Sequence, residues 1–172
     1  MKLVPIMESL PTEKTANSKK ERKELFHAFD PNGNGYLSLA ECDLGLISLG
    51  KKCPKPVILR AYKAACQVAQ EHGQNLTEAG NDYIEFQEFR LFLVNLKKYT
   101  LLWEIFVSLD TGNDRRIDRK EFRKGIKKLE KLGVTVEDAD KEFDIIDADH
   151  GGQILFEEFG DWGLQYVYPE MN

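Results

Sequence analysis

Four stretches of the chain repeat one pattern of oxygen-bearing side chains over twelve residues. Each stretch ends in Glu and carries Leu or Ile at its eighth place. Oxygens at places 1, 3, 5, 7, 9 and 12, with a sharp turn at place 6, form the ligand set of a calcium-binding loop. The pattern therefore predicts calcium-binding chemistry, and the four stretches are residues 30–41, 77–88, 110–121 and 147–158.

The first stretch meets every requirement of such a loop. Gly35 stands at the turn, where a positive φ is needed and glycine adopts it freely. Two of its ligands are carboxylates, so the pattern does not demand a high affinity. We expect ligation by the side chains of Asp30, Asn32, Asn34, Ser38 and Glu41 and by the carbonyl of Tyr36.

The fourth stretch is nearly complete. Gly152 stands at the turn, but Gly151 and Leu155 offer no side-chain oxygen at places 5 and 9, so water would have to serve there. We expect a site formed by Asp147, Asp149, Gly151, the carbonyl of Gln153, and Glu158.

The third stretch has more acids at its ligand places, but it departs from the pattern at two positions. Gly112 occupies place 3, and Arg115 occupies the turn, where a left-handed backbone costs roughly 1 kcal/mol relative to glycine. Calcium binding and its absence are equally compatible with this sequence. The candidate ligands are Asp110, Asp114, the carbonyl of Arg116, Asp118 and Glu121.

The second stretch has lost most of its ligands. Glu85 and Glu88 remain as obvious oxygen donors, and we expect a structural hand that keeps its helices and its Ile84 contact but binds no ion. The cofactor predicted for the whole chain is therefore two to three Ca²⁺ ions. Thr77, Ala79 and Asn81 replace the first three ligands, and Asp82 stands at the turn.

Apolar residues at helical spacing flank the loops, as in EF-hands. The expected fold is all-α, with four helix-loop-helix units in two pairs and short β bridges between paired loops. Ser18 and Glu21 predict a capping box ahead of the first helix. We expect an irregular N-terminal arm over residues 1–17, EF-hand pairs over 18–98 and 99–168, and a tail over 169–172.

Composition narrows the functional class. The chain has 172 residues, 42% of them hydrophobic, and a net charge of -5. Its apolar runs are too short for a membrane span or a secretory signal. The three cysteines match neither a zinc site nor a redox pair, so we expect reduced thiols and a cytoplasmic location. The three histidines are isolated from nucleophiles and metal triads, so we do not expect an enzyme.

Residues 115–131 are strongly basic and hold nine of the 24 Lys and Arg residues. Such a helix could meet an anionic membrane or an acidic partner. The alternative, which we favour, is a solvated face that balances the acidic loops. We do not expect nucleic acid as a partner, because the net charge is negative and no base-reading motif is present.

Beyond the loops, four segments resemble the calflagins, the flagellar calcium-binding proteins. The likeness runs from about Leu10 to Trp162. The segments are residues 10–16, 24–30, 84–91 and 129–138. This resemblance implies a calcium sensor of the flagellar or ciliary membrane.

The resemblance also implies that the two C-terminal hands bind calcium, whereas the residues themselves favour the first loop. We keep all three loops as candidates. Family members are acylated at an N-terminal Gly and a nearby Cys, and this sequence departs from that pattern at Met1 and Lys2.

The predicted function is calcium sensing, in which ligation exposes an apolar surface to a specific protein target. Two alternatives stay open at this point. One is a calcium buffer whose helices barely move, and the other is a structural interaction module whose shape does not depend on calcium.

Overall fold

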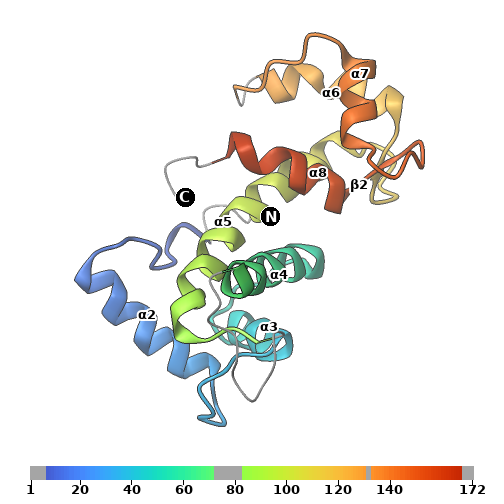
Figure 1. The fold of residues 1–172 in the computed structure, drawn as a ribbon. Helices are drawn as coiled ribbons and strands as arrows, with labels where there is room; N and C mark the ends of the chain where they lie inside the picture. The colour runs from blue at the N-terminus through green and yellow to red at the C-terminus, as the bar shows by residue number, and fades with distance from the viewer. Residues whose placement is uncertain (1–6, 72–82, 131–132, 168–172) are drawn as a thin grey trace. The chain divides into compact units, whose positions relative to one another are not determined.

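A computed structural model describes residues 7–71, 83–130 and 133–167 of the chain. The described residues are mainly helical, which confirms the all-α prediction (Figure 1). In chain order the elements are α2 (Ala16–Phe29), α3 (Leu39–Ser48), α4 (Lys55–Glu71), α5 (Phe86–Leu109), β1 (Arg116–Ile117), α6 (Arg119–Glu130), α7 (Ala139–Ile146), β2 (Ile154–Leu155), α8 (Phe156–Gly163) and the 3₁₀ helix η1 (Leu164–Tyr166).

The chain divides into two compact units, residues 1–97 and 98–172. The division falls inside α5, because this helix both leaves the second loop and leads into the third. Hand 1 comprises α2, the first loop and α3, and hand 2 comprises α4, the second loop and the start of α5. Hand 3 runs from the rest of α5 to α6, and hand 4 from α7 to α8.

The first helix begins earlier than its sequence suggests. The Thr15 side chain accepts the Ser18 N–H at 3.2 Å and caps α2, which starts at Ala16. The capping box predicted at Ser18 is therefore wrong, because the Ser18 hydroxyl instead accepts a hydrogen bond from Arg22 at 3.0 Å. α3 does begin with a capping box, formed by Ser38 and Glu41.

Loops pair through short antiparallel contacts at their eighth places. In unit 1, Leu37 and Ile84 exchange backbone hydrogen bonds of 2.8 and 3.0 Å. In unit 2, β1 pairs with β2 so that Ile117 lies opposite Ile154. All four side chains are fully buried. Each loop therefore shares a small apolar contact with its partner, so a displacement of one loop also displaces the other.

Aromatic side chains form the core of each unit. In unit 1, Phe89 lies edge-on to Phe26 and Phe29, with ring centroids 5.3 and 5.6 Å apart. In unit 2, Phe106 lies edge-on to Phe156 and Phe159 at 5.5 and 5.6 Å. These rings come from helices on both sides of the loops, so burial of the rings fixes the angle between those helices.

The N-terminal segment differs from the irregular arm that the sequence predicts. Residues 1–6 lie outside the described residues, but Met7 and Leu10 are 1% and 4% exposed, and Thr12 is 2% exposed. Residues 9–15 are in neither helix nor strand, as an irregular arm would be, but the segment is packed at Met7, Leu10 and Thr12, and α2 already begins at Ala16. The sequence pattern does not reveal this packing because three of the residues that hold the segment, Lys51, Arg90 and Lys97, lie far along the chain.

Candidate calcium sites

The first loop places its ligands around a turn at Gly35. The Gly35 N–H donates to Asp30 Oδ2 at 2.9 Å, with Gly35 at φ +83°. Glu41 is held by Ser38, whose N–H and hydroxyl both donate to Glu41 Oε2 at 2.8 Å. The amide of Asn32 donates to the other carboxylate oxygen of Glu41 at 2.7 Å. Oxygen donors therefore stand at every ligand place, and the residues present fit calcium.

The fourth loop gathers three acids most tightly. Ligand oxygens of Asp147, Asp149 and Glu158 lie within 4.8 Å of one another. Asp147 is 3% exposed, and its Oδ2 accepts the Gly152 N–H at 3.0 Å. Its Oδ1 is buried without a hydrogen-bond partner in the described structure. A buried carboxylate oxygen left unpaired is unfavourable, and a bound cation would supply its missing partner.

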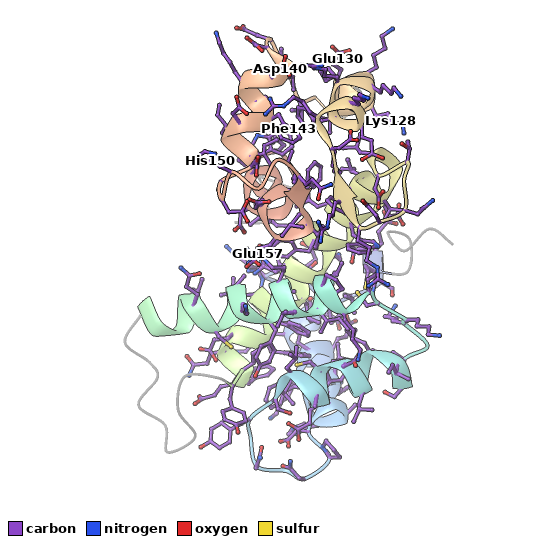
Figure 2. All side chains as sticks on the ribbon, turned by 90° about the vertical axis from the view of Figure 1, so that its right-hand side faces the viewer. Lys128, Glu130, Asp140, Phe143, His150 and Glu157 are labelled. Atoms are coloured by element: carbon purple, nitrogen blue, oxygen red, sulfur yellow. The ribbon has the colours of Figure 1, made fainter. Side chains whose placement is uncertain are left out.

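The glycine at place 5 of the fourth loop has a steric role. A β-carbon on Gly151 would lie 2.8 Å from Asp149 Oδ1, so a side chain there would displace that ligand. The Gly151 N–H instead donates to the same oxygen at 2.8 Å and orients it. His150 points outward from the loop (Figure 2) and is exposed. The fourth loop therefore has no side-chain oxygen at place 5, but the glycine there lets Asp149 keep its position.

The final glutamate accepts hydrogen bonds within its own loop in the first, third and fourth loops, but in the third loop three donors share one of its oxygens. Glu121 Oε1 accepts the N–H and hydroxyl of Thr111 and the N–H of Gly112, each at 2.8 Å. Among the described residues, the four acids of this loop do not converge as those of the fourth do. Asp110 keeps the usual turn contact, with the Arg115 N–H on its Oδ2 at 2.9 Å. The donor set fits calcium poorly as it stands.

The electrostatics of Glu121 agree with this description. Burial alone would raise the pKa of Glu121, but hydrogen bonds from Asp118, Thr111 and Gly112 outweigh burial and lower the pKa below its ordinary value. Arg115 takes φ +66°, the left-handed turn that the sequence pattern required of it. Thr111 was missed by the sequence analysis because place 2 of the loop has no assigned ligand role.

Two residues predicted to offer backbone carbonyls to calcium are joined through their side chains. Arg116 and Gln153 occupy place 7 of the third and fourth loops, and the Arg116 guanidinium donates to Gln153 Oε1 at 2.7 Å. The Asp114 carboxylate accepts the Arg116 N–H at 3.0 Å, and Asp118 Oδ1 accepts the Glu121 N–H at 2.7 Å. The Arg116–Gln153 hydrogen bond therefore adds a side-chain link between loops that β1 and β2 already join.

The second loop lies partly outside the described residues, including Thr77, Ala79, Asn81 and Asp82. Glu88 is 6% exposed, and burial raises its pKa. The Glu85 N–H donates to Glu88 Oε2 at 3.1 Å. Tyr83 lies beside Tyr36 of the first loop, with ring centroids 6.4 Å apart. The described part of this loop thus supports its partner loop through apolar and aromatic contacts.

The arginines of the basic helix are engaged within unit 2. Arg123 donates two hydrogen bonds to the Asp140 carboxylate at 2.9 and 2.7 Å. Arg119 donates to Asp144 Oδ1 at 2.5 Å, and its guanidinium carbon lies 4.3 Å from the centre of the Phe143 ring. Figure 2 labels Asp140 and Phe143 on α7. These arginines join α6 to α7, so the basic helix is not solvated on every side.

Lysines on the same helix remain exposed. Among the residues that the structure describes, Lys120, Lys124 and Lys127 have no hydrogen-bond or ion-pair partner. Lys128 donates to the carbonyl of Ser108. Lys131 lies outside the described residues. The helix thus divides into an arginine side directed at α7 and a lysine side directed at solvent.

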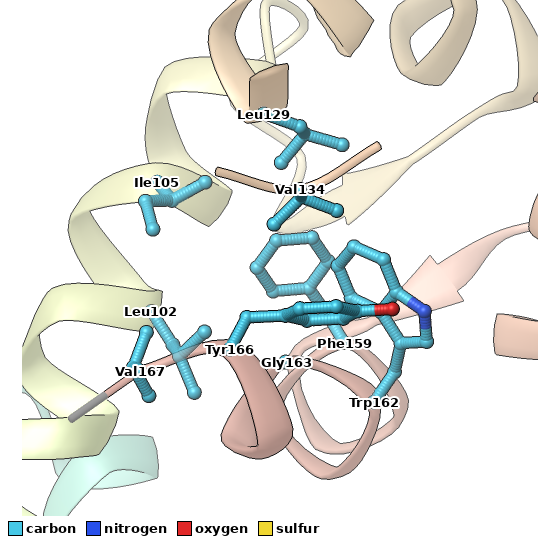
Figure 3. Close-up of a pocket in the computed structure, with 9 residues that line it drawn as sticks. All are labelled: Leu102, Ile105, Leu129, Val134, Phe159, Trp162, Gly163, Tyr166 and Val167. Atoms are coloured by element: carbon cyan, nitrogen blue, oxygen red, sulfur yellow. The ribbon is translucent and has the colours of Figure 1, made fainter. Parts of the chain in front are cut away.

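Unit 2 also contains an apolar groove, whose volume is about 20 Å³ (Figure 3). The Tyr166 ring covers Trp162, with centroids 5.1 Å apart, and Trp162 lies 5.5 Å from Phe159. The groove has room for about one water molecule in this conformation. Its walls come from α5, α6, α8 and the segment after each of α6 and α8, and they are Leu102, Ile105, Leu129, Val134, Phe159, Trp162, Gly163, Tyr166 and Val167.

Helix-loop-helix units with paired loops and convergent oxygens define an EF-hand calcium-binding protein. The family model described as the FCaBP EF-hand domain matches residues 6–96, and that of an EF-hand domain pair matches residues 100–162. Two relatives are the flagellar calcium-binding protein of Trypanosoma cruzi and the flagellar calcium-binding protein TB-17 of Trypanosoma brucei brucei. The chain is 33% identical to the former over 91% of its own length and 75% of the relative's. It is 32% identical to the latter over 91% and 68%.

A solved structure from Leishmania major Friedlin, of a homolog of programmed cell death 6 protein, is also similar. It has a TM-score of 0.43 and 21% identity, and it covers 82% of this chain and 69% of that chain.

The chain belongs to the family of flagellar calcium-binding proteins. These homologues are calcium-binding proteins and not enzymes. Within the described residues, no helix is both long and apolar enough to cross a membrane.

Proposed function

We propose that this EF-hand protein is a calcium sensor that exposes the groove of unit 2 to a protein target when calcium binds. The observation that supports a sensor is the placement of the groove walls. Leu102 and Leu129 lie on helices that flank the third loop, and Phe159 lies on the helix that follows the fourth. A change in helix angle at either hand would therefore open the groove.

One hydrogen bond spans hand 4 and must change if that hand opens. The Trp162 indole N–H on α8 donates to Glu142 Oε1 on α7 at 2.6 Å. In a sensor the angle between entering and exiting helices changes on ligation, whereas in a buffer it barely does. The environment of Trp162 therefore distinguishes the two functions.

The test is tryptophan fluorescence in a Trp103→Phe background, which leaves Trp162 as the reporter. A sensor should show a shift of the emission maximum during calcium addition, together with new binding of an apolar dye. Calcium binding measured by calorimetry with an unchanged Trp162 spectrum would identify a buffer. Absence of calorimetric binding would leave the calcium-independent interaction module.

For the ions, we propose that the first and fourth loops are occupied, with the third binding weakly. The unpaired Asp147 Oδ1 supports the fourth loop, and the complete oxygen set from Asp30 to Glu41 supports the first. In the third loop, calcium must displace the Thr111 and Gly112 donors from Glu121. Three donors compete with calcium at Glu121 Oε1, against one at Glu41 Oε1 in the first loop, so the expected affinity of the third loop is lower.

Anionic lipid is a second proposed partner, supported by the exposed side of α6. Lys120, Lys124 and Lys127 are available because the neighbouring arginines are engaged by α7. Each lysine near an anionic surface contributes roughly 1 kcal/mol. Replacement of all three by Gln should weaken binding to phosphatidylserine vesicles by on the order of 100-fold.

The matched control replaces Lys19, Lys20 and Lys23 of α2 by Gln, because these lysines are exposed and the net-charge change is the same. Equal loss in both triple variants would indicate a response to net charge alone.

We also propose a flagellar location, which rests on the names of the relatives. Fluorescence microscopy of the tagged chain in a flagellated cell tests that location.

A further inference from the structure

Residues 7–13 form a segment, here called the N-terminal strap, that is anchored on unit 1. Its apolar anchors are Met7 and Leu10, 1% and 4% exposed. Its backbone is locally ordered, since the Leu10 N–H donates to the Met7 carbonyl at 3.1 Å and the Thr12 N–H to the Leu10 carbonyl at 2.9 Å. Burial of apolar side chains of this size stabilises the packed arrangement. The strap is therefore a packed part of the unit.

Two arginines hold three successive carbonyls of the strap. Arg22 on α2 donates to the carbonyls of Pro11 and Glu13 at 3.0 and 2.7 Å. Arg90 on α5 donates to the carbonyl between them, that of Thr12, at 2.8 Å. Hydrogen bonds from charged donors are worth about twice as much as those between neutral groups. The strap is thus fixed to the entering helix of hand 1 and the exiting helix of hand 2.

The other end of the strap is tied to the exiting helix of hand 1. Lys51 Nζ donates to Ser9 Oγ at 2.8 Å. The Lys51 N–H donates in turn to the carbonyl of Leu46 on α3 at 2.9 Å, across a helix end where Gly50 has φ +70°. This closure fixes Lys51 to α3. The strap therefore connects α3 at Ser9 with α2 at Glu13.

From this connection we propose that the strap opposes opening of hand 1 and lowers the calcium affinity of the first loop. The inference rests on the calcium site proposed there. Four residue steps separate Ser9 from Glu13, and a chain of that length extends to about 14 Å at most. If ligation rotates α3 away from α2, either the Ser9 or the Arg22 contacts must break. Calcium binding and strap docking are therefore energetically coupled.

Thermodynamic linkage makes this coupling reciprocal. Weakening the strap should tighten calcium binding at the first loop, and calcium at that loop should loosen the strap by the same factor. Couplings of this kind are typically about 5-fold or more. The strap would then set the calcium level at which hand 1 responds.

The experiment uses the full chain with Leu10→Ala or Arg22→Gln. Lys23→Gln is the matched control for the second variant, because it removes the same charge from a neighbouring exposed position on α2. Calcium binding at the first loop is followed by the amide NMR signal of Gly35, whose N–H meets Asp30, and separately from the fourth loop by that of Gly152. We expect Leu10→Ala and Arg22→Gln to bind calcium at the first loop about 5-fold to 10-fold more tightly, and Lys23→Gln to match the parent.

Hydrogen exchange in the unmodified chain gives a second measurement that does not depend on the folding of a variant. Calcium should speed exchange at the amides of Leu10 and Thr12, and Glu41→Gln, which removes a first-loop ligand, should abolish that effect. Equal first-loop affinities in all four proteins, with unchanged exchange, would overturn the role of the strap while leaving the calcium site intact. Absence of any Gly35 response in every protein would overturn both the site and the strap's role.

Discussion

Glu121 Oε1 accepts the backbone N–H of Gly112 at 2.8 Å, so the last ligand place of the third loop contacts its third place directly. Gly112 has no side chain to occupy the space between them. The carboxylate of Glu121 therefore takes hydrogen bonds that a calcium ion would have to replace. The partner loop makes the corresponding contact more loosely, with the Asp149 N–H 3.3 Å from Glu158 Oε1, and Asp149 itself brings a carboxylate to place 3.

Gly112→Asp should convert the third loop into a stronger calcium site. A β-carbon at Gly112 would lie 3.5 Å from Glu121 Oε1 and 3.9 Å from Asp110 Oδ1, which is ordinary contact. The new carboxylate adds a ligand at place 3 and repels Glu121 when no ion is present. We expect the third-loop affinity to rise by at least about 10-fold, measured by calorimetry. Gly112→Ala, which fits the same space without a ligand, should leave the affinity near that of the parent, and an equal gain in both variants would contradict this explanation.

Asp147→Asn should weaken calcium binding at the fourth loop by on the order of 100-fold, because it removes a charged ligand from the place where three acids converge. The amide oxygen of Asn can still accept the Gly152 N–H, so the turn should persist. Calorimetry together with the Gly152 amide signal measures the loss. Asp161→Asn, on α8 outside the loop, removes the same charge and should not change the affinity. Retention of fourth-loop binding in Asp147→Asn would refute the assigned role of Asp147.

Gly45→Ala should destabilise unit 1 although alanine favours helices. A β-carbon there would lie 2.5 Å from the Phe29 ring, and Phe29 is 1% exposed and packed against Phe89. Overpacking of this kind costs about 1–3 kcal/mol, and the helical preference for Ala over Gly offsets up to about 1 kcal/mol. We expect a lower free energy of unfolding in urea. Leu44→Ala, at an exposed position on the same helix, should change it far less. A stabilised Gly45→Ala protein would show that Phe29 can move aside.

The α6–α7 ion pairs should make stability depend on pH in the acid range. Hydrogen bonds from Arg123 hold the pKa of Asp140 below its ordinary value. A carboxyl with a lowered folded-state pKa contributes stability above its unfolded pKa of about 4, and that contribution is lost as pH falls through the folded value. Calcium-free Asp140→Asn should therefore be less heat-stable than the parent at pH 7 and equally stable near pH 2.

Salt provides the control for this effect, since both partners are substantially exposed and exposed pairs are screened. The difference between the parent and Asp140→Asn should shrink in 1 M salt. Glu137→Gln, an exposed acid just before α7, should show no comparable difference at pH 7. A difference between the parent and Asp140→Asn that persisted undiminished at low pH would mean that packing of residue 140, and not its charge, is responsible.

The loops themselves were predictable because their determinants are local. Asp30, Gly35 and Glu41 lie within twelve residues, and the turn they form needs little help from the rest of the chain. The β contacts at Leu37 and Ile84 follow from the same spacing. The family resemblance depended on equally local segments, and the comparisons confirm it.

Contacts between distant residues were decided by the tertiary structure. Thr12 meets Arg90 and Lys97 across more than seventy residues, and Arg123 meets Asp140 from another helix. Periodicity assigns such side chains to a polar face but cannot say which partner that face will meet. Sequence alone therefore determined where the candidate calcium ligands stand along the chain. Packing between helices determined which carboxylate oxygens are already hydrogen-bonded, which arginines are paired, and why the N-terminal segment is buried.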